Sequence, residues 1–388
     1  MVVYGFEFTQ TELILLSAFA VFFAYQLYFY FHYLRAVLRL KKQTAKNRIN
    51  FEVQKFPVSV IICAKDELDN LREYLPYVLN QDYPEYEVIV VNDGSGEETE
   101  MLLNNFRKDY PHLRTTFVPA GATNLSTKKL ALTLGIKAAK NEWVLFTDAD
   151  CMPEDKCWIE RMSRNFGPGT EFVLGYGAYF RKKGFLNKLI TYDTLLIGLQ
   201  YLGAALKGKP YMGVGRNMAY RKDMFMKNNG FSRTLKLKSG DDDLLVNRFA
   251  NEFNTKVEIA PDSITWSEPE KRYSDWIYQK ERHLSVSSAY SGTSKFRLAV
   301  EPAFRALFYL TLIGSLVFGN LITMIAAGVL FLTKFFVQMG IVNASSKHFA
   351  GRNYHFSVLV FDILLPLINL YLMIFGKMGT KAKHVYWK

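Results

Sequence analysis

Residues 143–150 read Trp-Val-Leu-Phe-Thr-Asp-Ala-Asp, a mostly apolar run that ends in two aspartates. A short run of this kind, rich in β-branched and aromatic side chains, predicts a buried β-strand. Side chains at positions i and i+2 of an extended chain point the same way, so Asp148 and Asp150 would face one pocket. The stretch therefore predicts a strand that delivers two carboxylates to one place.

Two similar strands are predicted earlier in the chain, at 58–63 and 88–91, with helices between the strands. The helix after the second strand would begin with a capping box of Ser95 and Glu98, and a further helix would cover 128–139. Strands that alternate with helices predict an α/β fold, a mostly parallel, Rossmann-like sheet with helices on both faces. Ligands of such sheets bind beyond the carboxyl ends of the strands, which is where we look for chemistry.

Polar residues follow each predicted strand at that edge, Ala64-Lys65-Asp66-Glu67 after the first and Asn92-Asp93-Gly94-Ser95 after the second. An Asp-Gly pair is most often only a turn, but acids at three strand ends favour one shared site. A hard cation such as Mg²⁺ prefers a few carboxylates together with substrate phosphates, and Asp150 could hold one against a diphosphate leaving group. Asp93 suits a nucleoside, and Lys128 could meet a phosphate or be an ordinary surface lysine.

The second half of the predicted domain is rich in glycine and acid. Glycines in 175–179 and 211–220 would let the backbone approach a ligand closely. Asp241-Asp242-Asp243 is predicted to open a helix that ends near Phe253, and the helix dipole alone could account for these acids. Mutual repulsion also raises a carboxylate pKa and produces a usable general base. The apolar stretch 185–206 is predicted to be a core or interface-lying helix, because a crossing would separate the two acidic groups.

The ends of the chain predict membrane helices. Residues 13–34 contain no Asp, Glu, Lys or Arg, and a helix of that length spans a hydrocarbon core of about 30 Å. Glu7 and Glu12 precede this stretch, and seven basic residues follow it: Arg35, Arg39, Lys41, Lys42, Lys46, Arg48 and Lys55. The positive-inside rule then predicts an external N-terminus and a cytoplasmic domain, with the basic run at lipid headgroups.

Later apolar blocks at 304–336 and 356–375 predict further spans. The first is long for one helix and short for two, although Gly319-Asn320 could form a tight turn. The tail lysines favour a single crossing plus an interfacial helix, whereas the length favours two crossings. Both alternatives stay open.

Composition excludes little. The net charge of +12 is explained in part by the juxtamembrane run, and no motif predicts a nucleic-acid partner. Cys63, Cys151 and Cys157 have no spacing that suggests disulfides or a zinc site, so we expect reduced thiols.

The motifs in this order resemble the family 2 glycosyltransferases of the GT-A fold, in the membrane-bound branch with cellulose, hyaluronan and poly-N-acetylglucosamine synthases. The resemblance covers about 58–283 and includes Gly240-Asp241-Asp242 and Gln279-Lys280-Glu281-Arg282-His283, which is similar to that family's Gln-x-x-Arg-Trp motif. It implies a metal-dependent, inverting hexosyltransferase that uses Mg²⁺ or Mn²⁺ and a nucleotide-diphosphate sugar, for which we expect UDP. Because His283 replaces the tryptophan, addition of single sugars to a lipid or glycan acceptor is expected rather than polymerisation.

The resemblance also implies roles for individual residues. Asp242 would be the base, with Asp241 beside it, and Asp150 and Asp148 would hold the metal. The nucleotide-sugar side would comprise Ala64, Asp66, Glu67, Asp93, Lys128, Asp148, Asp150, Gln279 and Arg282. The acceptor side would comprise Gly215, Arg216, Asn217 and His283.

The expected organisation places seven parts along the chain of an integral protein of a bacterial inner (plasma) membrane. They are an N-terminal anchor (1–38), a basic linker (39–55), a cytoplasmic catalytic domain (56–268), interfacial helices (269–300), one or two membrane helices (301–340), another membrane helix (355–376) and a basic tail (377–388). Two rival hypotheses are a polyprenyl-phosphate sugar transferase of the dolichol-phosphate-mannose type and a non-catalytic scaffold that binds nucleotide or anionic lipid. The first would need no base, since its acceptor phosphate is already ionised.

Overall fold

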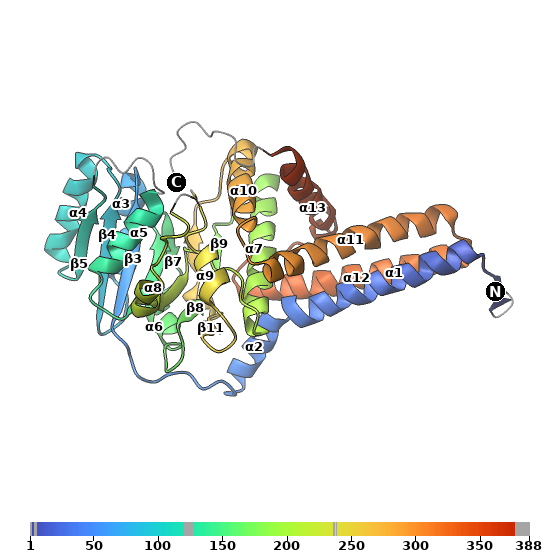
Figure 1. Cartoon of the computed structure of the whole chain (residues 1–388), viewed down its shortest axis with the longest axis horizontal. Helices are drawn as coiled ribbons and strands as arrows, with labels where there is room; N and C mark the ends of the chain where they lie inside the picture. The colour runs from blue at the N-terminus through green and yellow to red at the C-terminus, as the bar shows by residue number, and fades with distance from the viewer. Residues whose placement is uncertain (1, 4–5, 120–126, 236, 238, 377–388) are drawn as a thin grey trace.

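The computed structural model describes residues 2–3, 6–119, 127–235, 237 and 239–376. An α/β body forms one part of the molecule, and three long helices extend from it to one side (Figure 1). The tail lysines of the predicted basic segment lie outside the described residues.

The central sheet of the body has seven strands in the order β11-β8-β10-β6-β3-β4-β5. Their bounds are β3 Val58–Ala64, β4 Tyr86–Asn92, β5 Leu113–Phe117, β6 Trp143–Asp148, β8 Phe172–Leu174, β10 Met218–Arg221 and β11 Thr255–Val257. Strands β3, β4, β5 and β6 are parallel to one another, whereas β10 is antiparallel to both of its neighbours. The predicted mostly parallel α/β fold is confirmed, with β10 as an inserted antiparallel strand.

The register of the central strands determines which loops meet. Every residue of β3 is buried, as expected for a strand covered on both faces. Ala64 of β3 pairs with Asn92 of β4, and Cys63 pairs with Asp148 of β6. The three predicted carboxylate-bearing loops therefore leave the sheet at the same level and the same edge.

Six helices belong to the body around this sheet. They are α3 Leu68–Leu79, α4 Glu97–Asp109, α5 Thr127–Ala138, α6 Trp158–Ser163, α8 Lys222–Lys227 and α9 Asp243–Phe249. The predicted capping box is wrong: the N-cap of α4 is Gly96, and the Ser95 hydroxyl instead accepts a hydrogen bond from the Asp66 amide at 3.0 Å. Helix α9 ends four residues earlier than predicted, at Phe249, because Ala250 already has extended backbone.

A second sheet, which the sequence did not reveal, has the order β7-β12-β9. It consists of β7 Cys151–Pro153, β12 Thr265–Ser267 and β9 Gly177–Tyr179, and the 3₁₀ turn Pro261–Ser263 leads into β12. Ser267 pairs with Cys151, so the end of β12 lies beside the second aspartate of the Asp-Ala-Asp run.

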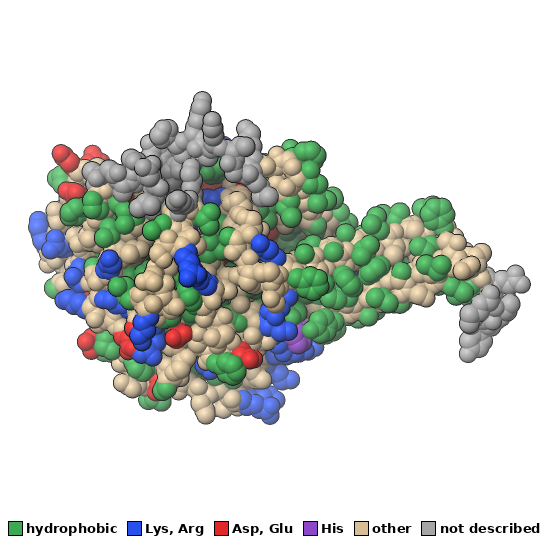
Figure 2. Space-filling view, viewed as in Figure 1, with side chains coloured by type: hydrophobic (Ala, Val, Ile, Leu, Met, Phe, Trp, Pro, Cys, Tyr) green, Lys and Arg blue, Asp and Glu red, His purple; other side chains and the backbone are tan. Residues whose placement is uncertain are grey.

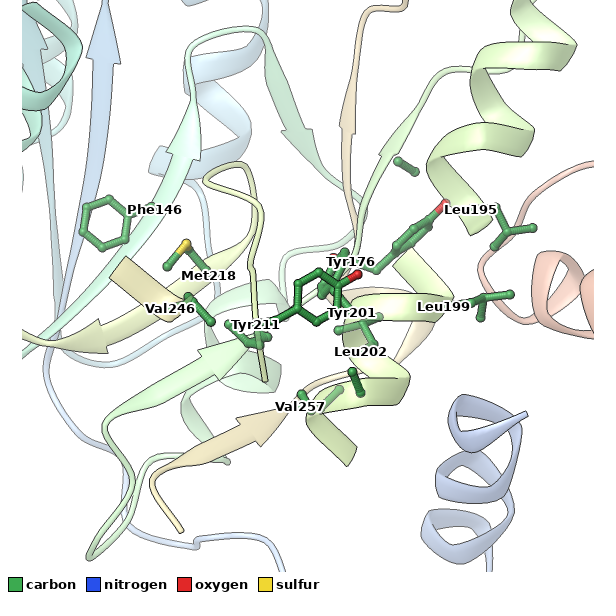
Figure 3. Packing of buried hydrophobic residues seen from close by; sticks show 14 of the residues in the cluster. Phe146, Tyr176, Leu195, Leu199, Tyr201, Leu202, Tyr211, Met218, Val246 and Val257 are labelled. Atoms are coloured by element: carbon green, nitrogen blue, oxygen red, sulfur yellow. The ribbon is translucent and has the colours of Figure 1, made fainter. Parts of the chain in front are cut away.

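Helix α7 (Phe185–Leu206) fills the interior between the two sheets and the long helices. Figure 3 shows its side chains, Leu195, Leu199, Tyr201 and Leu202 among them, packed near Tyr176 and Tyr211. Leu199 and Leu202 are fully buried, and Tyr201 is 1% exposed. Although α7 is long and apolar enough to cross a membrane, it is the core helix that the sequence predicted as one of two options.

The long helices form a three-helix bundle of α1 (Gln10–Phe29), α11 (Gly292–Phe318) and α12 (Leu321–His348) (Figure 1). Phe19, Phe308 and Ala327 contribute one residue from each helix to its fully buried centre. A π-helical turn, Tyr30–Leu34, joins α1 to α2 (Ala36–Ala45) at the body. Two short paired strands, β1 (Val2–Val3) and β2 (Phe6–Glu7), precede α1. Figure 2 shows hydrophobic side chains over the bundle and Lys and Arg side chains over the body.

Two helices occupy the apolar block 304–336, for which the sequence left open the choice between one and two crossings. Helix α11 ends at Phe318, Gly319 and Asn320 form the predicted tight turn, and α12 begins at Leu321. The Asn320 side chain accepts a hydrogen bond from the Thr323 amide at 2.9 Å and so caps α12. Among the described residues, five helices are long and apolar enough to cross a membrane: the continuous helical stretch Gln10–Ala45, counted as one, and α7, α11, α12 and α13.

Helix α13 (Ser357–Phe375) is not a fourth member of the bundle. It leaves the base of the bundle in a different direction and lies near α10 (Tyr273–Ser287) and α7 (Figure 1). The Phe361 ring lies 5.1 Å from the Tyr192 ring of α7, and Phe356 stacks on Phe335 of α12. The helix expected at 355–376 therefore exists, but its packing partners are on the body and at the base of the bundle.

Candidate active site

The loops after β3 and β4 are tied to each other at the edge of the sheet. The Asp93 amide donates to the Ala64 carbonyl at 2.8 Å, and Asp93 Oδ2 lies 3.1 Å from Lys65 Nζ. Asp66 has a positive φ of 55°, which turns its amide towards the Ser95 hydroxyl. Ala64, Asp66 and Asp93 thus lie in one region, with Asp93 only 7% exposed. Glu67, at the start of α3, accepts a hydrogen bond from Asn70.

Asp148 and Asp150 lie together, as the i, i+2 spacing predicts. Their ligand atoms and the Cys151 sulfur are all within 4.8 Å of one another. Burial and the neighbouring Asp148 carboxylate raise the pKa of Asp150, and the Ser267 hydroxyl donates to Asp150 Oδ2 at 2.7 Å. Burial also raises the pKa of Cys151, so this thiol keeps its proton. Two carboxylates that disfavour each other's charge fit a hard divalent cation, which would relieve that repulsion.

Lys128, in the first turn of α5, joins the acids of two different segments. Its Nζ lies 3.2 Å from Asp148 Oδ1 and 3.7 Å from Asp241 Oδ2. Burial lowers the pKa of Lys128, but Asp148 and Asp241 together raise it above the ordinary value. In turn, burial raises the pKa of Asp148, whereas Lys128 lowers it below the usual range. Lys128 is therefore a half-buried, charged bridge, and the surface-lysine alternative is wrong.

The three consecutive acids have three different environments. Asp241 faces Lys128, while Asp242 accepts hydrogen bonds from the Gly215 amide at 2.7 Å and the Asp243 amide at 2.8 Å. Burial, followed by the charge of Asp241, raises the pKa of Asp242 to about 6. Burial and the charge of Asp242 raise the pKa of Asp243, which lies near Tyr290. Only Asp242 combines a pKa near neutrality with an oxygen directed at the glycine-rich loop.

One cavity is lined by some of these groups, but not by Asp66, Asp93 or Asp150. Its lining includes Lys128 and Asp148 together with Gly215, Asp241 and Asp242. Residues from β6, α5, the loop before β10 and the start of α9 therefore share one space. Phe146 and Met218, which Figure 3 labels, line the apolar side of the same cavity.

The glycine-rich segment 213–217 divides between the site and the core. The Arg216 guanidinium lies 4.2 Å from the centre of the Tyr179 ring and donates to the Ala178 carbonyl at 3.2 Å. Its charge lowers the pKa values of both Asp148 and Asp150, so it lies near these two carboxylates. Asn217 is fully buried, and its amide bonds Tyr176, Ser263 and Trp158. The prediction that Asn217 lines the acceptor side is wrong, because its side chain is bonded within the core.

Helix α10 lies beside these residues. Gln279 donates to the Tyr179 hydroxyl at 3.1 Å, and the charge of Arg282 lowers the pKa of Asp148. The Arg282 Nε is buried, with no hydrogen-bond partner among the described residues. The next residue, His283, is exposed. Gln279 and Arg282 therefore lie near Tyr179 and Asp148, and the roles expected for this motif stay predictions.

The sequence did not predict several residues that contribute to the site. Lys65 was visible beside Asp66, but nothing indicated its ion pair with Asp93. Ser267 lies 117 positions from Asp150 along the chain, and no local pattern predicts their hydrogen bond. Tyr179 lay in a segment chosen for its glycines, and only the fold reveals its contacts with Arg216 and Gln279.

Comparisons with known proteins agree with this geometry. Residues 59–228 match the family model described as Glycosyl transferase family 2. The poly-beta-1,6-N-acetyl-D-glucosamine synthase of Staphylococcus epidermidis is 26% identical over 214 residues, which are 54% of this chain and 49% of that protein. The probable glycosyltransferase YdaM of Bacillus subtilis is 25% identical over 231 residues, 58% of this chain and 54% of that protein. The aligned part spans about half the length of these relatives.

A solved structure supports the fold over nearly the whole chain. The mannosyltransferase PcManGT from Pyrobaculum calidifontis, determined with GDP-Man and Mn²⁺, has a TM-score of 0.61 at 17% identity. The match covers 95% of this chain and 99% of that one. With the family match and the arrangement of carboxylates at the sheet edge, residues 59–228 are identified as a family 2 glycosyltransferase domain, and the chain has a GT-A fold.

Proposed function

We propose that this chain is a metal-dependent, inverting glycosyltransferase that moves a sugar from a nucleotide-diphosphate donor, expected to be a UDP-sugar, to a hydroxyl group of a lipid or glycan acceptor at a membrane. The bridge formed by Lys128 between Asp148 and Asp241 carries this proposal. It supports a single site in which the carboxylates assigned to the donor and those assigned to the base act on one substrate pair.

The donor side of the proposal rests on the chemistry of its ligands. Asp150 and Asp148 offer the oxygen ligands that Mg²⁺ and Mn²⁺ prefer. A bound cation would neutralise the negative charge that grows on the departing diphosphate. Lys128 and Arg216 supply positive charge next to these carboxylates, and Asp93, held by Lys65, offers oxygens to the nucleoside.

The acceptor side rests on Asp242. A general base works best when its pKa lies near the operating pH, and the pKa of Asp242 is raised to about 6. The hydrogen bond from the Gly215 amide fixes one oxygen, so the carboxylate is oriented before the acceptor arrives. One base that takes the acceptor proton opposite a departing diphosphate implies displacement with inversion, so an α-linked donor gives a β-linked product.

The membrane part of the proposal has three crossings. Helices α1, α11 and α12 would cross, whereas α13, which the sequence predicts as a membrane helix at 355–376, would instead lie at the cytoplasmic interface beside the body. An external N-terminus followed by three crossings leaves the body, α13 and the basic tail on the cytoplasmic side, in agreement with the positive-inside rule. The bacterial plasma membrane is the setting that we propose, with Arg35, Arg39 and Lys42 at the headgroups.

A direct assay tests this proposal. The purified protein in detergent is incubated with a panel of radiolabelled nucleotide sugars, Mg²⁺ or Mn²⁺, and membrane lipids, and the labelled product is identified. We expect one donor to label a lipid or glycan product only when the divalent cation is present. The absence of product with every donor, together with nucleotide binding that ignores the metal, would overturn the proposal.

A binding experiment separates the enzyme from a scaffold. Divalent cation should tighten UDP binding to the wild type, and Asp150→Ala should abolish that tightening. Asp69→Ala is the matched control, because Asp69 is a highly exposed aspartate of α3 that pairs only with Arg72 among the described residues. A scaffold that binds nucleotide without metal would bind equally well after either substitution.

A further inference from the structure

The lysine next to Lys128 has a different environment. Lys129 is fully buried, and its Nζ donates to the backbone carbonyls of Thr234, Leu237 and Ser239 at 2.8, 2.9 and 2.8 Å. Burying an ammonium group is costly unless its protons are hydrogen-bonded, and here three carbonyls accept them. The three acceptors all belong to one short stretch of chain.

That stretch leads directly into the acid triplet. Ser239 is followed by Gly240, whose φ of +82° turns the chain, and then by Asp241 and Asp242. A Cβ on Gly240 would lie 2.6 Å from Val286 of α10, so the turn is closely packed. The charges of Asp241 and Asp242 also act on Lys129 and oppose the effect of burial, which lowers its pKa to about 8. The ammonium therefore lies near the two acids and holds the backbone that precedes them.

We propose that Lys129 is a positioning residue of the transfer reaction, whose ammonium holds the chain before Gly240 so that Asp241 and Asp242 face the cavity containing Lys128 and Asp148. This inference rests on the proposed function, because it assigns a task to a residue that touches neither donor nor acceptor. The adjacent lysines then have different roles: Lys128 pairs with carboxylates, and Lys129 fixes the backbone that precedes Asp242.

The geometry gives this task an energetic reason. The base must be held near its productive position, since a displacement of about 1 Å can cost about 100-fold in rate. Asp242 is held from the other side by the Gly215 amide at 2.7 Å, so one carboxylate oxygen and the chain upstream are both fixed. Loss of the Lys129 hydrogen bonds would free the upstream side while leaving the donor-binding carboxylates on β4 and β6 in place.

The test uses the full-length protein and a graded series of variants. Lys129→Met keeps the length of the side chain without donors, Lys129→Gln keeps two donors without charge, and Lys129→Arg keeps both. We expect kcat at saturating donor to fall by about 10- to 100-fold in Lys129→Met, less in Lys129→Gln and least in Lys129→Arg. The donor KM and metal-dependent UDP binding should stay close to the wild-type values. Lys137→Met, an exposed lysine of the same helix, is the matched control.

Hydrogen exchange gives a readout that needs no substrate. In Lys129→Met, the amides of 239–246 should exchange faster than in the wild type, while those of β3 and β4 should keep their protection. This result would support the positioning of the acid triplet even if no sugar transfer were detected, so failure of the proposed function remains distinguishable.

Three results would overturn the inference. One is a wild-type kcat in all three Lys129 variants. Another is a parallel loss of kcat and UDP binding, which would indicate a general packing role. The third is faster exchange throughout the sheet with no added effect at 239–246. If Lys129→Met does not fold, the Gln and Arg variants decide between these outcomes by the same measurements.

Discussion

Two groups of charged side chains in the described part of the protein are built differently. At the candidate active site, Asp148 and Asp241 share Lys128, whereas Asp150 and Asp242 have no ion pair among the described residues. At the base of the helix bundle, two acids and two bases neutralise each other: Glu301, Arg305, Lys334 and Asp362. The ion pairs of the candidate site therefore leave acids without a base, whereas those of the helix group are balanced.

The helix group also satisfies its central carboxylate with hydrogen bonds. Asp362 of α13 accepts from Arg305 at 3.1 Å, from the Tyr309 hydroxyl at 2.6 Å, from Gln338 at 2.8 Å and from Lys334. These partners come from α11 and α12, so one carboxylate joins three helices. Balanced charges hold a structure together, whereas an excess of acids in a cavity calls for a cation or proton from outside.

The largest expected difference between the two charged groups is in catalysis. Asp242→Asn should lower kcat by about 10²- to 10⁴-fold, because the amide cannot take the acceptor proton. Initial rates at saturating donor measure the loss, and UDP binding with metal should remain. Nearly intact activity would contradict the base and favour the polyprenyl-phosphate rival, whose acceptor is ionised already.

Substitutions in the balanced group should lower the stability of the protein and leave kcat unchanged. Asp362→Asn leaves Arg305 and Lys334 with one acid between them, and removing one partner of a buried pair typically costs about 3–5 kcal/mol. Thermal unfolding in detergent should show the loss, while kcat, measured below the unfolding range, stays near that of the wild type. The double variant Lys334→Met with Asp362→Leu should lose less than Asp362→Asn alone, because Glu301 and Arg305 remain paired. If the stability losses caused by substituting Lys334 and Asp362 were strictly additive, the two residues would not belong to a coupled network.

The pH dependence tests the unbalanced group. The pKa of Asp242 is raised to about 6, and the base acts when deprotonated, so kcat should rise about tenfold per pH unit below about 6 and level off above it. Stability should respond with the opposite sign. A raised carboxyl pKa means that the folded state holds the proton more tightly, so this group lowers stability as the pH rises from 3.8 to about 6. An acid limb of kcat centred near pH 4 would contradict this environment.

The smallest effect should come from the far end of the bundle. Glu12 accepts from the Thr9 amide at 2.8 Å and from the Asn320 amide at 2.5 Å, joining the start of α1 to the turn between α11 and α12. Glu12→Gln keeps an acceptor and should cost only about 1 kcal/mol, the usual value of a capping interaction. Thermal unfolding measures it, and a detectable change in kcat would show that the turn communicates with the cavity.

Local sequence patterns predicted the sheet edge and the acids on it. Val58–Ala64 and Trp143–Asp148 are mostly apolar runs; polar residues follow the first and end the second, so the type and ends of both strands follow from the local sequence. The contacts that complete the site join distant segments. Asn217 was assigned to the acceptor side, but the indole of Trp158 and the carbonyl of Ser263 bind it in the core. The direction of α13 was equally hidden, since composition gives its length but not its neighbours.

The contact between α10 and the end of α13 has a consequence for protein engineering. Gly376 follows α13, and a Cβ there would lie 3.2 Å from the Glu281 carboxylate of α10, the helix that carries Gln279 and Arg282. The helix that carries these two residues is thus supported by an apolar helix outside the α/β body. A fragment of residues 56–268 would retain the carboxylates of the sheet edge but lose α10, so we expect it to bind donor and to be a poor transferase.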